Sequence, residues 1–188
     1  MRGHLLLFLR APMLGRGKRR LAAAIGDVAA VRFERLMIAR LTCRLGRDPR
    51  WRLRLVVTPD RGRPRGALPQ GRGDLGVRMH RALAAGPPGP KLLIGADIPS
   101  LAAEHIANAF RLLGDHDVVF GPAEDGGYWL VGARHRMPRF GKVRWSSAHA
   151  LDDTLAYLPK RISVGFAETL GDVDDGKSYR RFAATRGF

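Results

Sequence analysis

The chain contains a single cysteine, Cys43, among 188 residues, so no disulfide can form within it and no cysteine cluster can bind zinc. Its six histidines show no metal-ligand spacing, which leaves a zinc hydrolase without support. No stretch approaches the roughly 20 apolar residues that a membrane span needs. The opening apolar run 5–9 is too short for the core of a signal peptide and is closed by Arg10. We therefore expect a cytoplasmic protein without a membrane partner.

Acidic side chains are scarce in the first half of the chain. Residues 1–94 hold 21 basic and 5 acidic side chains, whereas residues 95–188 hold 12 of each, so the whole net charge of +16 lies in the first half. Such asymmetry favours a phosphorylated substrate, a nucleic acid or an anionic membrane as partner. Only 5 of the 33 basic residues are lysines, and this excess of arginine indicates a coding bias as a second source of the charge.

The composition that remains is that of an ordinary globular protein. Of the residues, 45% are apolar and 27% are charged, and a chain of this length buries a substantial core. No internal repeat and no long linker divides the sequence. We expect a single domain over residues 1–188.

Apolar runs bounded by turn residues alternate with helical patterns along the chain, which is typical of an α/β protein with a largely parallel sheet. In the first half the pattern predicts strands at 4–9, 52–58 and 91–96, helices at 28–45 and 74–85, and a loop at 61–73. In the second half it predicts strands at 117–120, 128–131 and 161–164 and helices at 101–113, 148–158 and 175–184. The link 121–127 is too short for a parallel crossover, so we expect a mixed sheet.

The first candidate site is the glycine-containing basic loop that follows the first strand. Gly15 and Gly17 let backbone N–H groups approach an anion, and Lys18 and Arg20 can neutralise phosphate oxygens. The loop suits the phosphates of a nucleotide. An ordinary turn followed by a solvated basic face has the same sequence, so both interpretations stay open.

Acidic residues form a second candidate site. Asp97 follows the predicted strand 91–96, at the sheet edge where open α/β proteins bind ligands, and it can hold Mg²⁺ or Mn²⁺ on a diphosphate. Asp172 or Asp174, in the acidic run before the last helix, can supply a further metal ligand. The competing interpretation is helix capping, by Asp97 or Ser100 for the helix near 101 and by Asp174 for the last helix.

The segment 121–129 combines two acids, glycines and two aromatic residues between two strands. It suits a pocket for a sugar or a base, and its Asp125-Gly126 pair equally suits a hairpin turn. Residues 73–79 can contact a base or ribose, or only begin a helix. At Trp145-Ser146-Ser147 a helix start preceded by a packed Trp is favoured over a serine nucleophile, because no Gly-x-Ser-x-Gly elbow surrounds the serines.

Taken together, these segments resemble the radical-SAM/selenodomain-associated transferase 1 (rSAM) family, a branch of the nucleotide-diphospho-sugar transferase (GT-A) superfamily. The similarity covers nearly the whole chain, and its most specific block is Gly121 to Tyr128. Arg10 stands where the family usually has Lys, and Arg19 stands where it has Thr. The other motifs that carry the resemblance are Gly17-Lys18-Arg19-Arg20-Leu21, Gln70 with Gly73 to Met79, Gly95 to Pro99, Val143 to Ser146 and Asp172 to Asp174.

The resemblance implies a Rossmann-like αβα sandwich, the GT-A fold, in which the loop after the first strand takes the nucleotide and Asp97 takes the metal. It implies a transferase that depends on Mg²⁺ or Mn²⁺ and uses a nucleotide or nucleotide-sugar donor and a small-molecule acceptor. The expected catalytic residues are Lys18, Arg20 and Asp97, and the expected metal ligands are Asp97, Asp172 and Asp174. Substrate contacts are expected from Arg10, Gly15, Gly17, Asp74, Gly76, Arg78, Asp125, Gly126, Gly127 and Tyr128.

Two chemistries share this scaffold. In glycosyl transfer an acceptor hydroxyl attacks the anomeric carbon of a nucleotide sugar, and the family resemblance favours this reaction. In nucleotidyl transfer a substrate phosphate attacks the α-phosphorus of a nucleoside triphosphate, and the basic loop favours this alternative because pyrophosphate needs more neutralisation. The chain is also similar, more distantly, to the guanylyltransferases of molybdenum-cofactor and phospholactate metabolism.

Two alternatives belong to other classes of protein. One is a non-catalytic nucleotide-binding protein, and the other is an arginine-rich nucleic-acid-binding protein. Against the latter, the sequence contains no basic motif interleaved with aromatic residues of the kind that nucleic-acid recognition modules use.

Overall fold

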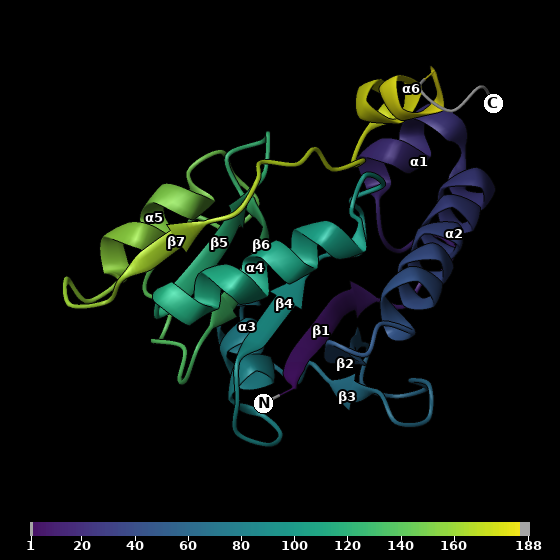
Figure 1. The fold of residues 1–188 in the computed structure, drawn as a ribbon. Helices are drawn as coiled ribbons and strands as arrows, with labels where there is room; N and C mark the ends of the chain where they lie inside the picture. The colour runs from purple at the N-terminus through teal and green to yellow at the C-terminus, as the bar shows by residue number, and fades with distance from the viewer. Residues whose placement is uncertain (1, 185–188) are drawn as a thin grey trace.

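The computed structural model describes residues 2–184, in which a seven-stranded sheet carries helices on both faces (Figure 1). The strands are β1 (Gly3–Arg10), β2 (Trp51–Thr58), β3 (Leu68–Pro69), β4 (Lys91–Ile94), β5 (Val118–Pro122), β6 (Tyr128–Ala133) and β7 (Val164–Phe166). The helices are α1 (Arg19–Ile25), α2 (Asp27–Gly46), α3 (Leu75–Ala84), α4 (Ala103–Asp115), α5 (Ala150–Tyr157) and α6 (Gly176–Ala184). None of the helices described is long and apolar enough to cross a membrane.

The sheet has the order β3-β2-β1-β4-β6-β5-β7. The pairs β1–β2, β1–β4, β2–β3 and β5–β7 are parallel, whereas β6 runs antiparallel to both of its neighbours, β4 and β5. From β1 the chain moves outward to β2 and β3 and then returns across α3 to β4, on the other side of β1. The strand order therefore reverses between β1 and β4, and open α/β sheets bind ligands outside the carboxyl ends of strands at such a point.

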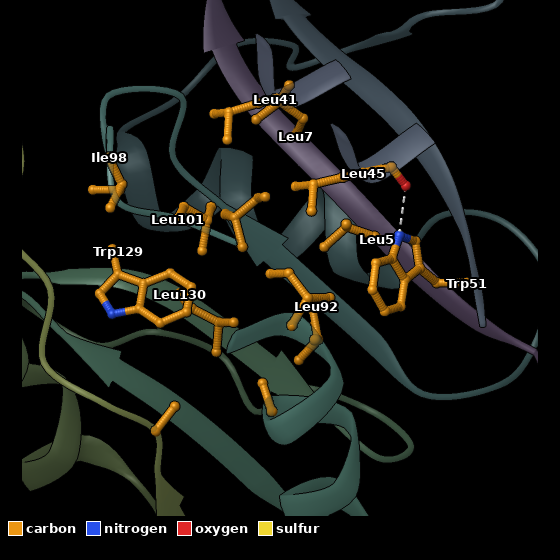
Figure 2. Packing of buried hydrophobic residues seen from close by; sticks show 14 of the residues in the cluster. Leu5, Leu7, Leu41, Leu45, Trp51, Leu92, Ile98, Leu101, Trp129 and Leu130 are labelled. Carbon is orange, nitrogen blue, oxygen red and sulfur yellow. Dashed lines mark hydrogen bonds between the residues drawn. The ribbon is translucent and has the colours of Figure 1, made fainter. Parts of the chain in front are cut away.

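Side chains on the two faces of the central strands pack into two separate hydrophobic clusters. Leu5 and Leu7 of β1 pack in a cluster with Leu41 and Leu45 of α2 and with residues of α4, and Figure 2 shows part of this cluster. Leu6, between them, belongs to a second cluster on the opposite face, with residues of α3 and α5. Alternation along the strand thus gives each face an apolar surface, which is why helices cover both. The αβα sandwich and the mainly parallel, mixed sheet expected from the sequence are confirmed.

A third, smaller cluster joins the two ends of the chain. Phe33 of α2 lies edge-on to Tyr179 and Phe182 of α6, with ring centroids 5.5 and 5.8 Å apart. Leu21 of α1 and Val173, just before α6, are buried in the same cluster. This packing holds the loop before α1 and the acidic segment before α6 on the same side of the sheet.

Several element boundaries differ from the sequence-based predictions. The loop 61–73 contains the short strand β3, because residues 68–69 pair with the edge of β2. The strand expected at 161–164 lies at 164–166, where it pairs with β5. Ser100 does not cap the next helix, since α4 begins at Ala103 and the Ala102 N–H donates to the Nδ1 atom of His105.

The C-terminus of α2 is held by a side chain from the following strand. Trp51 is 1% exposed, and its indole N–H donates to the Leu45 carbonyl oxygen at 2.8 Å, as the dashed line in Figure 2 shows. The last carbonyls of a helix lack an intrahelical donor, so this bond satisfies a buried acceptor that would otherwise be unpaired.

We predict that Trp51→Phe lowers the free energy of unfolding by about 1–3 kcal/mol, because the ring volume is largely kept while the buried Leu45 carbonyl loses its donor. Urea unfolding measures the change. The control is Arg52→Gln on the exposed side of the same strand, which should stay within about 0.5 kcal/mol of the wild-type chain. Equal stability of Trp51→Phe and Arg52→Gln would contradict this role of the indole N–H.

Candidate active site

The candidate site is centred on the ammonium group of Lys18, which lies between two carboxylates. Lys18 Nζ lies 3.0 Å from Asp97 Oδ2 and 3.2 Å from Asp174 Oδ1. Lys18 is the N-cap residue of α1, Asp97 follows β4, and Asp174 precedes α6. One cation thus ties together three segments that are far apart in the sequence and that meet at the carboxyl ends of β1 and β4.

The backbone brings the second acidic segment to Asp97. The Val173 N–H donates to the Asp97 carbonyl oxygen at 3.0 Å, and Val173 itself is buried in the cluster of α1, α2 and α6. This bond places Asp172 and Asp174, on either side of Val173, beside the end of β4. The structure therefore brings Asp97, Asp172 and Asp174 together, as the sequence-based hypothesis requires.

The protonation of Lys18 is controlled by this environment. Burial by itself lowers the pKa of Lys18, but the charges of Asp97 and Asp174 and the hydrogen bonds to them outweigh burial and leave the pKa above its usual value. The side chain is 11% exposed, so the ammonium is largely removed from water. A buried cation of this kind is stable only while it has anionic partners.

Arg20 and Asp174 form an ion pair beside the Lys18 bridge, with the Arg20 side chain largely exposed. Asp174 does not cap α6, contrary to the capping interpretation. The Asp175 carboxylate accepts the Ser178 N–H at 2.8 Å and takes that role. Because the next residue caps the helix, the Asp174 carboxylate is available for the two cations.

A cavity of about 280 Å³ opens between the ends of β1 and β4. Its polar lining includes Arg10, Lys18, Asp97 and Asp174 together with Glu34 of α2, and Gly17 and Gly95 supply backbone. Burial raises the pKa of Glu34, an effect that the Lys18 backbone and charge oppose. Gly17 has a φ of +130°, and a Cβ there would lie 2.8 Å from Glu34 Oε1, so the loop needs glycine at this position.

Gly15 lies in the outer turn of the same loop. It has a φ of +68°, and the Arg16 N–H donates to the Met13 carbonyl oxygen across the turn. It lines a neighbouring groove with Gly17 and Lys18, not the cavity between β1 and β4. Of the loop residues singled out in the sequence, Gly17 and Lys18 therefore reach the cavity and Gly15 shapes the turn before them.

A second cavity, of about 200 Å³, lies on the other side of Asp97. It shares Gly95 and Asp97 with the first cavity and is also lined by Asp125 and Asp172. Burial raises the pKa of Asp172 to about 6, and the charges of Asp97 and Asp125 add to that shift. The second cavity therefore concentrates negative charge beside Asp97, whereas the first mixes both signs.

The segment 121–129 forms one wall of the second cavity. Asp125 Oδ1 accepts the Gly127 N–H at 2.9 Å in the turn between β5 and β6, so the hairpin interpretation of Asp125-Gly126 is confirmed. Gly126 has a φ of +84° and packs directly on the backbone of Ala148, which leaves no room for a side chain. Tyr128 lines the cavity, and burial raises the pKa of its phenol, an effect that the neighbouring Thr154 side chain opposes.

The residues singled out at the start of α3 have mainly local roles. The Asp74 carboxylate accepts the Val77 N–H at 2.8 Å and caps the helix, as the simpler interpretation predicts. Gly76 is buried under Trp145, whose ring a Cβ at this position would meet at 2.6 Å. Arg78 instead donates to Gln70 Oε1 at 2.8 Å, close to the end of β1.

The serines near residue 146 line the second cavity without the features of an activated nucleophile. Ser147 Oγ donates to the Arg144 carbonyl oxygen, and Trp145 packs edge-on to Phe140 with ring centroids 5.8 Å apart. The packed Trp is confirmed, but the helix itself begins later, at Ala150.

The sequence assigns no role to Glu34, and Gln70 enters only as part of a motif that carries the family resemblance. Glu34 is one of only two acids in α2, and it stands between the buried residues Phe33 and Met37, which is an available signal for a functional side chain. Gln70 is 2% exposed, yet it lies in a Gly- and Arg-rich segment that reads as a surface loop. No local sequence pattern predicts that burial.

The raised pKa of Asp172 leads to a predicted pH dependence of stability. Between about pH 4 and pH 6 the folded chain binds more protons at this group than the unfolded chain does. The free energy of unfolding therefore falls as the pH rises through that range. In metal-free buffer at pH 7.5, Asp172→Asn should therefore be more stable than the wild-type chain by about 1–2 kcal/mol, and the difference should vanish near pH 4. Urea unfolding across this range measures it, with the exposed Asp115→Asn as control. Equal stability of Asp172→Asn and the wild-type chain at pH 7.5 would show that burial and the neighbouring carboxylates do not raise the pKa of Asp172.

Comparison with solved structures shows the same fold. The chain superposes on a candidate nucleotide-diphospho-sugar transferase from Desulfovibrio desulfuricans G20 with a TM-score of 0.88 and 26% identity, covering 98% of this chain and 88% of that one. A CMP:2-keto-3-deoxy-manno-octonic acid synthetase solved with CTP gives a TM-score of 0.59 at 12% identity, covering 100% and 99%. Rv0371c from Mycobacterium tuberculosis H37Rv, solved with manganese, gives 0.56 at 16% identity, covering 98% and 100%.

Sequence comparison places the chain in a family. No curated protein matches it significantly. The sequence profile described as "Uncharacterized protein conserved in bacteria (DUF2064)" matches residues 42–147, which is more than half of the chain and includes Gln70, Asp97 and the segment 121–129. The structural similarity agrees with the nucleotide-diphospho-sugar transferase superfamily, while the narrower selenodomain-associated family remains a prediction. With its α/β sandwich and its acidic site at the strand-order reversal, this chain belongs to the DUF2064 family.

Proposed function

We propose that this protein is a metal-dependent transferase that takes a nucleotide donor, acting as a glycosyltransferase on a nucleotide sugar and a small-molecule acceptor. The observation that carries the proposal is that two cavities meet at Gly95 and Asp97, at the carboxyl ends of β1 and β4. A transferase needs two substrates to approach one point. The reacting groups would meet at Asp97, with the donor in the first cavity and the acceptor in the second.

The donor side is supported by its positive charges. Arg10 and Lys18 line the first cavity, and Arg20 lies beside it on Asp174. Ammonium and guanidinium groups bind phosphate oxygens strongly when they are partly removed from water. In the donor complex the Lys18 ammonium would exchange a carboxylate partner for a phosphate oxygen, while Gly17 allows the backbone of the loop to approach the phosphates closely.

The carboxylates suit a divalent cation. Asp97, Asp125 and Asp172 would supply hard oxygen ligands, and burial together with the charges of Asp97 and Asp125 raises the pKa of Asp172. Among residues 2–184 no three His, Cys, Asp or Glu side chains are grouped closely enough to hold a metal by themselves. Mg²⁺ is commonly held by one or two carboxylates together with substrate phosphates, so Asp97, with Asp172 or Asp174, fits a site that the donor completes.

When bound, such an ion would neutralise the charge that develops on the departing diphosphate. Side chains of the protein would bind and orient the two substrates. Lys18 and Arg20 would hold the phosphate oxygens, and Asp125 and the ring of Tyr128 would orient the acceptor in the second cavity. The manganese reported for Rv0371c, a protein of the same fold, is consistent with the class of metal.

Nucleotidyl transfer is the alternative, and the cations around the first cavity favour it. In this reaction a phosphate of the second substrate attacks the α-phosphorus of a nucleoside triphosphate, and pyrophosphate leaves with its negative charge balanced by Lys18, Arg10 and Arg20. The fold of the CMP:2-keto-3-deoxy-manno-octonic acid synthetase, solved with CTP, is compatible with this reaction. The two reactions use the same residues but release different products.

A panel of nucleoside triphosphates and nucleotide sugars, each with Mg²⁺ or Mn²⁺, tests the proposal by thermal shift. A ligand at 100 times its Kd stabilises the folded chain by about 2.7 kcal/mol. We expect at least one nucleotide to raise Tm in the presence of the metal and Asp97→Asn to abolish the metal-dependent part of the shift. Asp115→Asn, an exposed acid at the end of α4, is the matched control and should behave as the wild-type chain.

The same panel, followed by a product assay on the ligands that bind, separates the alternatives. Stabilisation by a nucleotide sugar and release of the nucleoside diphosphate support glycosyl transfer. Stabilisation by a triphosphate and release of pyrophosphate support nucleotidyl transfer. A metal-dependent shift that Asp97→Asn leaves intact would remove Asp97 from the site. No shift with any nucleotide would contradict the proposed function.

A further inference from the structure

Gln70 is a buried polar side chain whose hydrogen bonds link the backbone of β1 and β2 to one arginine. It is 2% exposed, and its Nε2 donates to the Leu9 carbonyl oxygen at 2.9 Å and to the Val56 carbonyl oxygen at 3.2 Å. Its Oε1 accepts from the Arg78 guanidinium at 2.8 Å. A buried carboxamide that uses both of its ends has one orientation, because any rotation would leave polar atoms unpaired. Gln70 therefore fixes the position of Arg78.

This chain of bonds brings Arg78 to the end of β1. Leu9, which accepts from Gln70, is followed directly by Arg10, the last residue of the strand. Burial lowers the pKa of Arg78, and the charge of Arg10 lowers it further, as expected for two like charges that lie close together. Arg10 lines the first cavity, and Gln70 links Arg78 to the carbonyl oxygen of Leu9, the residue directly before Arg10.

Within residues 2–184 neither arginine has a carboxylate partner at ion-pair distance. The Asp74 carboxylate caps α3, and its charge opposes the lowering of the Arg78 pKa, while Arg78 Nε donates to the Asp74 carbonyl oxygen at 3.3 Å. Glu34 lies against Gly17. Lys18, by contrast, is paired with two carboxylates. Two guanidinium groups that lie close together without an acid between them form the kind of site that binds an oxyanion.

We propose that Arg10 and Arg78, with Arg78 positioned by Gln70, form a second oxyanion subsite at the carboxyl end of β1 that binds a phosphate group. The subsite rests on the proposed function, to which it adds Arg78 as a further cation that acts together with Arg10. The phosphate belongs either to the donor nucleotide or to a phosphorylated acceptor. Gln70 acts as a positioning residue because it contacts Arg78 and not the ligand.

Calorimetric titration with inorganic pyrophosphate tests the subsite. Arg78→Met, on a partly exposed side chain, should weaken binding roughly tenfold, because a charge-assisted pair of hydrogen bonds is lost. Arg72→Met is the matched control, since Arg72 is an exposed arginine of the preceding loop, and it should bind as the wild-type chain. Unchanged affinity in Arg78→Met, an equal loss in Arg72→Met, or no binding of pyrophosphate to the wild-type chain would overturn the subsite.

The role of Gln70 is tested by a double-mutant cycle. Gln70→Met should lose as much affinity as Arg78→Met, and the double variant should lose no more than either, because both substitutions remove the same interaction. A loss in the double variant equal to the product of the two single losses would overturn the positioning role. If Gln70→Met fails to fold, Arg78→Lys replaces it, since a lysine keeps the charge but not the fork that Gln70 orients. Full affinity in Arg78→Lys would then overturn the role.

Two further titrations identify the source of the phosphate. A nucleoside triphosphate alone tests the donor, and inorganic phosphate added to the nucleotide-saturated chain tests the acceptor. Dependence of either titration on Arg78 supports the subsite and assigns its ligand, and independence of both overturns it. Nucleotide binding that persists in Arg78→Met, with pyrophosphate binding also unchanged, would refute only the subsite. Pyrophosphate binding that depends on Arg78, in a chain that binds no nucleotide, would refute only the proposed function.

Discussion

The site depends on one buried cation that holds two carboxylates. Lys18 leaves the loop after β1 and meets Asp97 from the end of β4 and Asp174 from the segment before α6. The ammonium is 11% exposed and would be costly to bury without anionic partners, whereas the two carboxylates stay about one third exposed. The hydrogen bond from the Val173 N–H to the Asp97 carbonyl oxygen and the packing of Phe33 on α6 also hold these segments together. The bridge is therefore a structural link, and under the proposed function it is the part of the site that would rearrange when a phosphate binds.

The arginine excess of the first half has a structural explanation that composition alone does not give. Several of these side chains donate to backbone carbonyls of distant segments instead of forming a binding surface. Arg44 on α2 donates to the Leu101 carbonyl oxygen at 2.6 Å, Arg2 donates to that of Trp51, and Arg63 closes its own loop through the carbonyl oxygens of Asp60 and Ala67. An arginine can fix a loop in this way because its five N–H groups spread over a plane.

The sequence predicts the sheet and the helices that cover it better than it predicts individual side-chain contacts. Leu5, Leu6 and Leu7 reveal a strand buried on both faces, and the short link between β5 and β6 correctly predicts an antiparallel pair, because local spacing decides both features. The cap of the last helix was predicted at Asp174, but Asp175 takes that role, and the Asp174 carboxylate is instead paired with Lys18. The burial of Gln70 was unpredictable, because it depends on carbonyl groups of β1 and β2 that lie far away along the chain.

The position of a bound metal tests the proposed function most directly. If the proposed function holds, Asp97 binds a divalent cation where donor and acceptor meet, and Lys18 turns from the carboxylates to the donor phosphates. Crystals grown with Mn²⁺ and the nucleotide that binds best would show the ion by its anomalous scattering. We expect a manganese peak about 2.0–2.3 Å from an Asp97 oxygen, with Lys18 Nζ at hydrogen-bond distance from a phosphate oxygen. A nucleotide bound away from the ends of β1 and β4, or a manganese ion that Asp97 does not touch, would contradict it.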